Sequence, residues 1–289
     1  MLTYPSWITP DLLHLGKVRV RWYGIMYLLG FLVGRLLLKR LCRRGFIRLN
    51  PRLIDDFLVV LFAGMVIGAR IIYMMVYYRA SPDEPFIWYW TPFAVWEGGL
   101  AFHGAVIGMC LGTWLFARWH KLHVWNLTDA LALAGSQGII FGRIGNFINA
   151  ELPGRVTESA MGMQFPVRWN EQIIGYTEPR HPSQLYEAVG EGLIPFALIW
   201  LLKPYVRYEG ILGALWLCFY AVARFFLEFF REKDAQLGYY FGWMTMGQIL
   251  CAAMFAVGLL ILLWNRYRAV PIAGEVACEE PPAPAAAEA

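Results

Sequence analysis

The chain has 289 residues, of which 58% are hydrophobic and 16% charged, against roughly 25% charged in an ordinary soluble domain, so the composition indicates a membrane protein. The net charge is +4, but the basic residues form no face that is interleaved with aromatic residues, which argues against nucleic acid as a partner. The five cysteines form no C-x-x-C pair, so neither a disulfide framework nor a zinc site is indicated.

Apolar segments long enough to cross a membrane recur along the chain. A transmembrane helix needs about 20 apolar residues. The sequence predicts seven of them, at residues 22–38, 56–77, 98–118, 127–148, 183–202, 210–230 and 243–264. The first has no recognisable cleavage site and is predicted to be retained. The predicted fold is an all-α polytopic membrane protein, with residues 1–268 as a single seven-span domain.

Lysine and arginine in the loops orient these predicted helices. The densest basic run lies between the first two spans and consists of Lys39, Arg40, Arg43, Arg44, Arg48 and Arg52. That loop is predicted to be cytoplasmic, which puts the N-terminus outside and the C-terminus inside. Residues 149–182 then form a small periplasmic subdomain. The Pro-, Ala- and Glu-rich residues 269–289 are predicted to be a disordered cytoplasmic tail.

The stretch GRIGNFINAELPGR (residues 142–155) gathers polar residues at the outer end of the fourth span. It contains Arg143, Asn146, Asn149, Glu151 and Arg155. Such a cluster at the end of a membrane helix is expensive unless it binds something polar. A guanidinium offers a fixed fork of donors to phosphate or carboxylate oxygens, so we expect a ligand of that kind. The alternative is that these residues cap and solvate a helix end.

A second polar group lies towards the outer end of the sixth span. Tyr220, Arg224 and Glu228 are spaced by four residues, so they share one helix face, and Arg231 falls near it. A simple intrahelical ion pair between Arg224 and Glu228 would also explain this spacing. Such a pair would not account for Arg143 and His103, which are expected at the same depth in the membrane.

Other polar residues receive structural interpretations. Arg70 is expected to pair with a carboxylate or with carbonyl groups inside the bundle, and Asp129 to cap a helix or bind a loop. Ser183 is expected to cap the start of the fifth span. His103, beside glycines in GGLAFHGA, fits a packed or hydrogen-bonded residue. Its ordinary pKa near neutrality equally makes it a natural proton acceptor.

Five motifs in order resemble one family. RWYG, WEGGLAFHG, GRIGNFINAELPGR, RHPSQLYE and ARFFLEFFREKDAQ are similar to the bacterial phosphatidylglycerol–prolipoprotein diacylglyceryl transferases, over roughly residues 16 to 264. The family usually has glycine where this chain has Ala150, and often an aromatic residue at Pro153. Neither difference removes a functional group.

The resemblance implies an enzyme of the bacterial inner membrane, with seven spans and an active site towards the periplasmic leaflet. The enzyme would move the diacylglyceryl group of phosphatidylglycerol to the lipobox cysteine of a prolipoprotein signal peptide and release glycerol phosphate. This is the first step of lipoprotein maturation. Membrane lipids would surround it, and no metal or organic cofactor is implied.

The resemblance also assigns residues. His103, Arg143 and Arg224 are the expected catalytic residues. The expected substrate-binding residues are Arg143, Asn146, Glu151, Gly154, Tyr23, Tyr220 and Glu228. The division of roles between the two arginines stays open. So does the base that accepts the thiol proton, since Glu151, Glu228 or a tyrosine could replace His103.

Three other functions compete with this one. A transporter for an anionic solute would predict polar residues through the cytoplasmic half and two similar halves, and neither pattern is evident. An intramembrane protease would need a Ser–His pair or two Asp residues at depth, whereas Ser183 lies at a helix start and Asp129 stands alone. A purely structural assembly factor could use the outer subdomain as a docking surface.

Overall fold

The computed structural model describes residues 2–15, 18–76, 93, 99, 101–169, 172–232, 240 and 242–272. These fall into two compact units: one consists of Met1–Leu37 and Asp129–Ile272, and the other is built on Leu38–Thr128. Helices α1 (Trp22–Arg43) and α4 (Val124–Ala134) each run from one unit into the other. The described chain is mostly helical, as predicted. Residues 273–289, which contain most of the predicted tail, lie outside the described residues.

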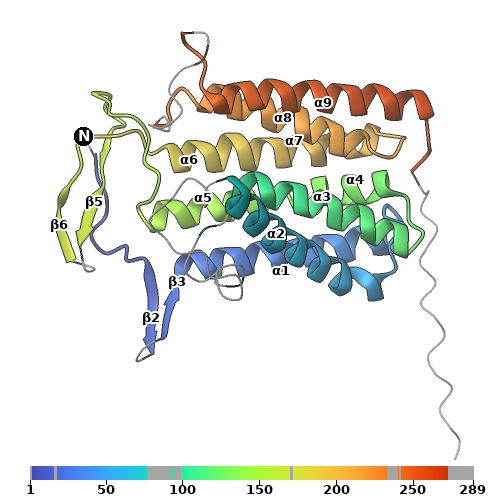
Figure 1. Ribbon diagram of the computed structural model, residues 1–289, viewed down its shortest axis with the longest axis horizontal. Helices are drawn as coiled ribbons and strands as arrows, with labels where there is room; N and C mark the ends of the chain where they lie inside the picture. The colour runs from blue at the N-terminus through green and yellow to red at the C-terminus, as the bar shows by residue number, and fades with distance from the viewer. Residues whose placement is uncertain are drawn as a thin grey trace, which may run out of the picture. The chain divides into compact units, whose positions relative to one another are not determined.

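The larger unit is a set of helices that lie side by side (Figure 1). Its elements are α5 (Gly138–Ile148), α6 (Ser183–Glu187), a π-helical segment (Ala188–Leu193), α7 (Ile194–Leu202), α8 (Ile211–Leu227) and α9 (Met246–Arg268). A short 3-10 helix, Lys203–Tyr205, follows α7. The continuous rod of α6, the π-helical segment and α7 contacts α5 and α8, and α8 packs along α9.

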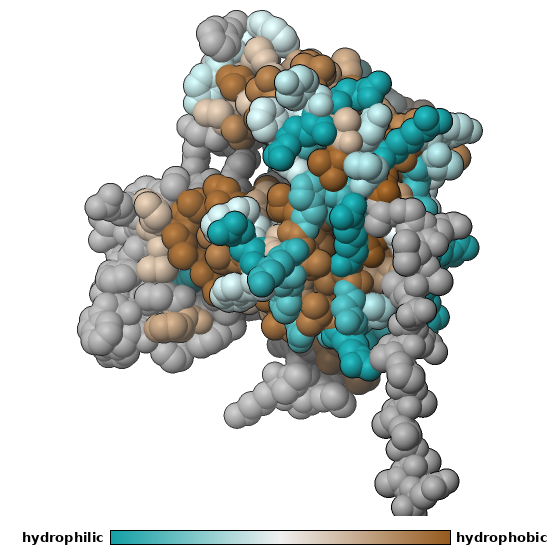
Figure 2. Space-filling model, turned by 90° about the vertical axis from the view of Figure 1, so that its right-hand side faces the viewer, coloured by the Kyte–Doolittle hydropathy of each residue, from teal (hydrophilic) through white to brown (hydrophobic). Residues whose placement is uncertain are grey.

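Helix α9 illustrates how local sequence sets the helix limits. Thr245 and Gln248 form a capping box at its start, because each side chain bonds the backbone N–H of the other. Arg266 and Arg268 lie in its last turn, where cations stabilise the helix dipole. Figure 2 faces the side towards which α9 ends, and hydrophilic side chains gather there among hydrophobic ones.

Glycines bring two helices of the smaller unit into close contact. A 3-10 turn, Pro51–Leu53, leads into α2 (Ile54–Val76), which packs against α3 (Phe102–Trp119). A side chain at Gly64 or Gly68 would collide with the backbone of α3 at Gly104 or Gly108. Small residues at such contacts let helix backbones approach in a membrane. The buried Arg70 on α2 donates to the carbonyl of Gly99 at 3.0 Å, which confirms the expected carbonyl partner.

The predicted continuous helix over residues 127–148 is wrong, because a turn at residues 135–137 separates α4 from α5. Glycine has a low helix propensity, and Gly135 stands at the break. Nε2 of Gln137 donates to the freed carbonyl of Ala134 at 3.0 Å and to that of Gly30 in α1 at 2.7 Å. The first bond satisfies a carbonyl that the interrupted helix leaves unpaired, and the second ties the turn to α1.

Short strands, which the all-α prediction omitted, form three two-stranded sheets. The strands are β1 (Leu2–Thr3), β2 (Asp11–Leu15), β3 (Val18–Arg21), β4 (Met163–Gln164), β5 (Pro166–Trp169) and β6 (Gln172–Tyr176). The pairs β2–β3 and β5–β6 are antiparallel, whereas β1 pairs in parallel with β4. The N-terminal segment is therefore part of the same subdomain as the insertion at 149–182.

Tyr4 joins this subdomain to the end of α5. It is buried with Met163 and Phe165, and its hydroxyl donates to the carbonyls of Phe147 at 3.1 Å and Ile148 at 2.8 Å. These carbonyls lie in the last turn of α5, where the regular helix donor four residues further on is missing. The Phe147 carbonyl also accepts from the Ala150 N–H at 2.9 Å. Burial raises the pKa of Tyr4 to about 12, so the hydroxyl keeps its proton at neutral and mildly alkaline pH.

Three helices among the described residues are long and apolar enough to cross a membrane, at Pro51–Met75, Ser183–Tyr205 and Met246–Arg268. Shorter apolar helices are Gly138–Ile148 and Ile211–Leu227. Each of the seven predicted segments contains helix in the described chain. The chain is therefore a helical membrane protein. The number of spans and their orientation stay predictions.

Candidate functional site: a buried arginine–glutamate cluster

Arg143, one turn before the end of α5, contacts two buried carboxylates. Its guanidinium lies 2.8 Å from Oε2 of Glu187 and 2.9 Å from Oε2 of Glu191. The Glu187 side chain is 1% exposed and that of Glu191 is 0% exposed. Buried charges of this kind persist when they are paired, because an unpaired ion costs several kcal/mol.

Arg224, in the last turn of α8, approaches the same two carboxylates. It lies 3.1 Å from Oε1 of Glu191 and 3.4 Å from Oε1 of Glu187. It also pairs with Glu228 on its own helix at 2.7 Å, as the four-residue spacing predicts. Glu228 in turn accepts a hydrogen bond of 3.0 Å from Oγ1 of Thr245. The ion pair is thus one part of a network that joins α6, the π-helical segment, α8 and the start of α9.

Arg231 and Tyr220 complete this group of side chains. Arg231 lies 3.4 Å from Oε1 of Glu187, and the buried Tyr220 interacts electrostatically with Glu191, Arg143 and Arg224. We call Arg143, Arg224, Arg231, Glu187, Glu191 and Glu228 the charge cluster. Its three guanidiniums balance its three carboxylates. A guanidinium has five N–H donors, so an anionic ligand can use those that the carboxylates leave free.

The sequence interpretation did not assign Glu187 and Glu191 to the site. Both belong to the predicted fifth span, and their four-residue spacing is the same signal that identified Arg224 and Glu228. Carboxylates within an apolar span are rare and mark functional or paired positions. Applying that rule to the fifth span would have found both residues.

The loop after α5, residues 149–155, is held by hydrogen bonds to the start of α6. Oε1 of Glu151 accepts from Asn149 at 3.1 Å, and Oε2 lies 3.5 Å from Nδ2 of the buried Asn146. Nε2 of Gln184 donates to the Glu151 carbonyl at 2.6 Å, and the Ser183 hydroxyl donates to Leu152 at 3.1 Å. Ser183 does not cap its helix, so the expected capping role is wrong. Its hydroxyl holds the loop.

Gly154 lies where this loop passes the end of α8. A side chain there would collide with the backbone oxygen of Phe230 and would lie 2.9 Å from Cβ of His181. Gly154 forms a β-bridge with Arg231, and its N–H donates to the His181 carbonyl at 2.8 Å. The absence of a side chain therefore lets the loop reach a residue of the charge cluster.

Asp129 has the structural role expected from the sequence. It is fully buried, and its carboxylate accepts from the N–H groups of Gly210 at 2.7 Å and Gly213 at 2.8 Å. These N–H groups lie at the start of α8, where the helix leaves donors unpaired. Asp129 thus caps α8, at the end opposite to Arg224.

Ala150 adopts a left-handed backbone conformation with φ of 55°. For a residue with a side chain this conformation costs roughly 1–2 kcal/mol. We therefore expect Ala150→Gly to raise the free energy of unfolding by about 1 kcal/mol. Thermal unfolding in detergent would measure the change, and a lower midpoint would contradict the interpretation. Leu152 also has φ of 55°, so Leu152→Gly provides a comparison in the same loop.

Of the remaining predicted site residues, the structure describes the side chain of Tyr23 but not that of His103. Tyr23, at the start of α1, interacts with Asn146 and Glu151, and its hydroxyl lies 3.0 Å from that of Tyr27. The side chain of His103 lies outside the described residues, so its role as proton acceptor stays a prediction.

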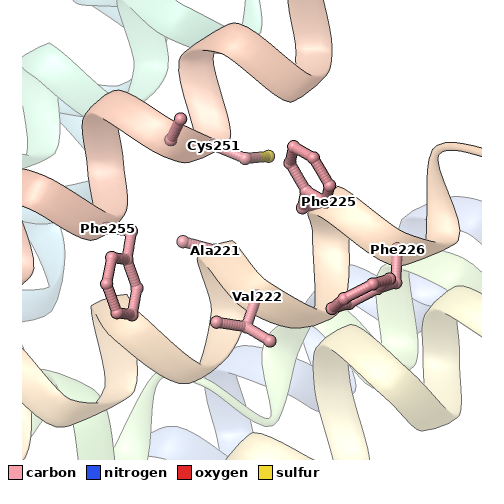
Figure 3. A pocket seen from close by; sticks show the side chains of 7 residues that line it. Ala221, Val222, Phe225, Phe226, Cys251 and Phe255 are labelled. Atoms are coloured by element: carbon pink, nitrogen blue, oxygen red, sulfur yellow. The ribbon is translucent and has the colours of Figure 1, made fainter. Parts of the chain in front are cut away.

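Apolar pockets lie along α8, and Figure 3 shows the one between α8 and α9. One is lined by Ala221, Val222, Phe225 and Phe226 from α8 and by Cys251, Ala252 and Phe255 from α9. A second cavity, of ≈ 560 Å³, lies along α7 and α8 and shares Val222, Phe226 and Phe255 with the first. Their lining suits hydrocarbon rather than a charged group.

A set of apolar helices that encloses an arginine–glutamate cluster defines this chain as a membrane protein with a buried polar site. The model of the family "Prolipoprotein diacylglyceryl transferase" matches residues 10–264. The chain belongs to this family.

Curated relatives cover nearly the whole chain. A phosphatidylglycerol–prolipoprotein diacylglyceryl transferase of Nitratidesulfovibrio vulgaris (strain Miyazaki F) is 41% identical over 270 residues, which are 92% of this chain and 97% of the relative. Proteins with the same name are 41% identical in Chromohalobacter salexigens, over 93% of this chain and 97% of theirs, and 38% identical in Chlorobaculum tepidum, over 92% of each.

Proposed function

We propose that this chain transfers the diacylglyceryl group of phosphatidylglycerol to the lipobox cysteine of prolipoproteins. The observation that carries the proposal is the pair Arg143 and Arg224, which share two buried carboxylates in a chain about 40% identical to named transferases. Guanidiniums that share carboxylate partners lie close together, and such groups bind phosphate oxygens through several N–H donors.

The proposed reaction balances as a nucleophilic substitution. The cysteine thiol gives its proton to a base, and the resulting thiolate attacks the terminal glyceryl carbon. A C–S bond forms, and the C–O bond to phosphate breaks with its electron pair on oxygen, so glycerol phosphate leaves. Negative charge concentrates on the phosphate as the bond breaks. Arg143 and Arg224 would stabilise that charge more in the transition state than in the ground state.

The proposed topology has seven spans, the N-terminus in the periplasm and the C-terminus in the cytoplasm of an inner membrane. The charge cluster would then lie towards the periplasmic leaflet. The six basic residues from Lys39 to Arg52 and the pair Arg266 and Arg268 support this orientation. The lipid and the signal peptide would both arrive laterally, because both lie in the bilayer.

The test is release of glycerol phosphate from phosphatidylglycerol by the purified protein in detergent. The reaction contains a lipobox peptide, and its control contains the same peptide with Cys replaced by Ser. Release that requires the thiol supports transfer. No release, although lipid and peptide both bind, rejects transfer and favours the transporter or assembly function.

His103→Gln is expected to lower the transfer rate about 100-fold, because glutamine cannot accept the thiol proton. Raising the pH should restore part of the rate, since a cysteine thiol with an ordinary pKa near 8.5 ionises unaided in that range. A pH–rate profile of both proteins measures this. An unchanged rate at neutral pH would assign the base to another residue.

A further inference from the structure

The π-helical segment contains a glutamate between two glycines, Gly190–Glu191–Gly192. A side chain at Gly190 would lie 2.7 Å from Cδ1 of Leu227 on α8. A side chain at Gly192 would lie 2.7 Å from Cγ1 and 3.0 Å from the backbone N of Ile140 on α5. The two glycines therefore let this segment pack directly against both α5 and α8, the helices that carry Arg143 and Arg224.

Glu191 uses each of its carboxylate oxygens for a different guanidinium. Oε2 lies 2.9 Å from Arg143, and Oε1 lies 3.1 Å from Arg224. The distances from Glu187 to its partners differ more, since it lies 2.8 Å from Arg143 but 3.4 Å from Arg224 and from Arg231. Glu228 pairs with the arginine on its own helix. Among these carboxylates, Glu191 makes the most even bridge between the two helices.

We infer that Glu191 is a positioning residue, which holds Arg143 and Arg224 close together so that both can donate to one phosphate group. This inference rests on the proposed transfer reaction. The carboxylate itself need not touch the substrate. It fixes two flexible side chains in one geometry before the lipid arrives, which preorganises the donors for the transition state.

The inference predicts a particular kinetic change for Glu191→Gln. A glutamine amide has one accepting oxygen, and its NH₂ group repels a guanidinium, so it can hold one arginine but not both. The loss of geometry should lower kcat about 100-fold. The variant also removes a negative charge beside two arginines, so the KM for phosphatidylglycerol should stay unchanged or fall.

A matched control is Glu209→Gln. Glu209 is 1% exposed and lies just before α8, at the end of that helix opposite to Arg224. It controls for the loss of a buried carboxylate, and its kcat should stay within about threefold of wild type. Thermal unfolding of both variants, with kcat expressed per folded molecule, distinguishes a change in the geometry of the arginines from a loss of folded protein. A role of Glu191 in folding alone would lower the unfolding midpoint and leave kcat per folded molecule unchanged.

A second pair of variants tests the packing without changing charge. Gly192→Ala should push the segment away from Ile140 and lower kcat, because the added Cβ meets backbone that cannot move aside locally. Gly138→Ala adds the same group to α5 itself, where nothing lies within 4 Å of the new Cβ, and should leave kcat unchanged.

The kinetic results either support or overturn the positioning role of Glu191. A fall in kcat without a rise in KM for Glu191→Gln, together with a lower kcat for Gly192→Ala, supports the positioning role. An unchanged kcat for Glu191→Gln, or a change confined to KM, overturns it. Wild-type protein that releases no glycerol phosphate in a thiol-dependent manner instead rejects the proposed function, so the two failures are distinguishable.

Discussion

Arg143→Ala should abolish transfer, with a loss of about 1,000-fold or more. Removing one preorganised donor to a developing negative charge costs about 10²–10³ in rate, and Arg143 offers several N–H donors. The variant also leaves Glu187 and Glu191 with one neighbour fewer, which destabilises a buried network by about 3–5 kcal/mol. Glycerol phosphate release measures the rate, and size-exclusion chromatography in detergent reports the folded fraction.

Arg143→Lys separates the two effects. Lysine keeps the positive charge for the carboxylates but replaces the planar fork with a single ammonium group. We therefore expect a folded protein that is strongly impaired in transfer. Full activity of Arg143→Lys would show that charge alone suffices. Full activity of the alanine variant would remove Arg143 from the proposed mechanism.

Gly154→Ala is expected to lower the rate about 100-fold, because a misplacement of about 1 Å near a site has effects of that size. The new Cβ would meet backbone oxygens of Phe230 and His181, so the loop or the end of α8 must shift. Arg231 follows Phe230 directly and contacts Glu187. The disturbance would therefore reach the charge cluster.

Gly175→Ala provides the matched control for that variant. Gly175 lies in β6 of the same subdomain, and a Cβ there would have nothing within 4 Å. Transfer rates and thermal unfolding of the two alanine variants should differ sharply. Equal rates for both would show that the close approach at Gly154 is unimportant for catalysis.

Apolar length predicted the helices well, because burial of backbone in a membrane leaves helix as the main solution. Apolar length could not predict the break at Gly135, because a turn within an apolar segment needs a hydrogen-bond partner from another helix. Here that partner is the carbonyl of Gly30 in α1, to which Gln137 donates. The local hairpins β2–β3 and β5–β6 were omitted because the all-α prediction considered only helical segments. The strand pair β1–β4 escaped prediction for the same reason as the break at Gly135. β1 pairs with residues about 160 positions later, a contact that local sequence does not encode.

The site was predictable where its contacts are local. Four-residue spacing gave Arg224 with Glu228, and Asp129 was correctly expected to cap or bind a loop. The partners of Arg143 lie 44 to 48 residues further along the chain, beyond the reach of any spacing rule. Ser183 was misassigned because a hydroxyl at a helix start has two uses, and packing of the loop at Leu152 decides between them.

The number of residues between Arg143 and its carboxylate partners also constrains when the charge cluster can form during synthesis. Glu191 follows Arg143 by 48 residues, an interval of roughly 2–10 s at a synthesis rate of about 5–20 residues per second. During that interval Arg143 has none of its later carboxylate partners, and an unpaired buried ion costs several kcal/mol. The charge cluster can therefore form only after α6 and the π-helical segment have been made, although α5 is synthesised well before them.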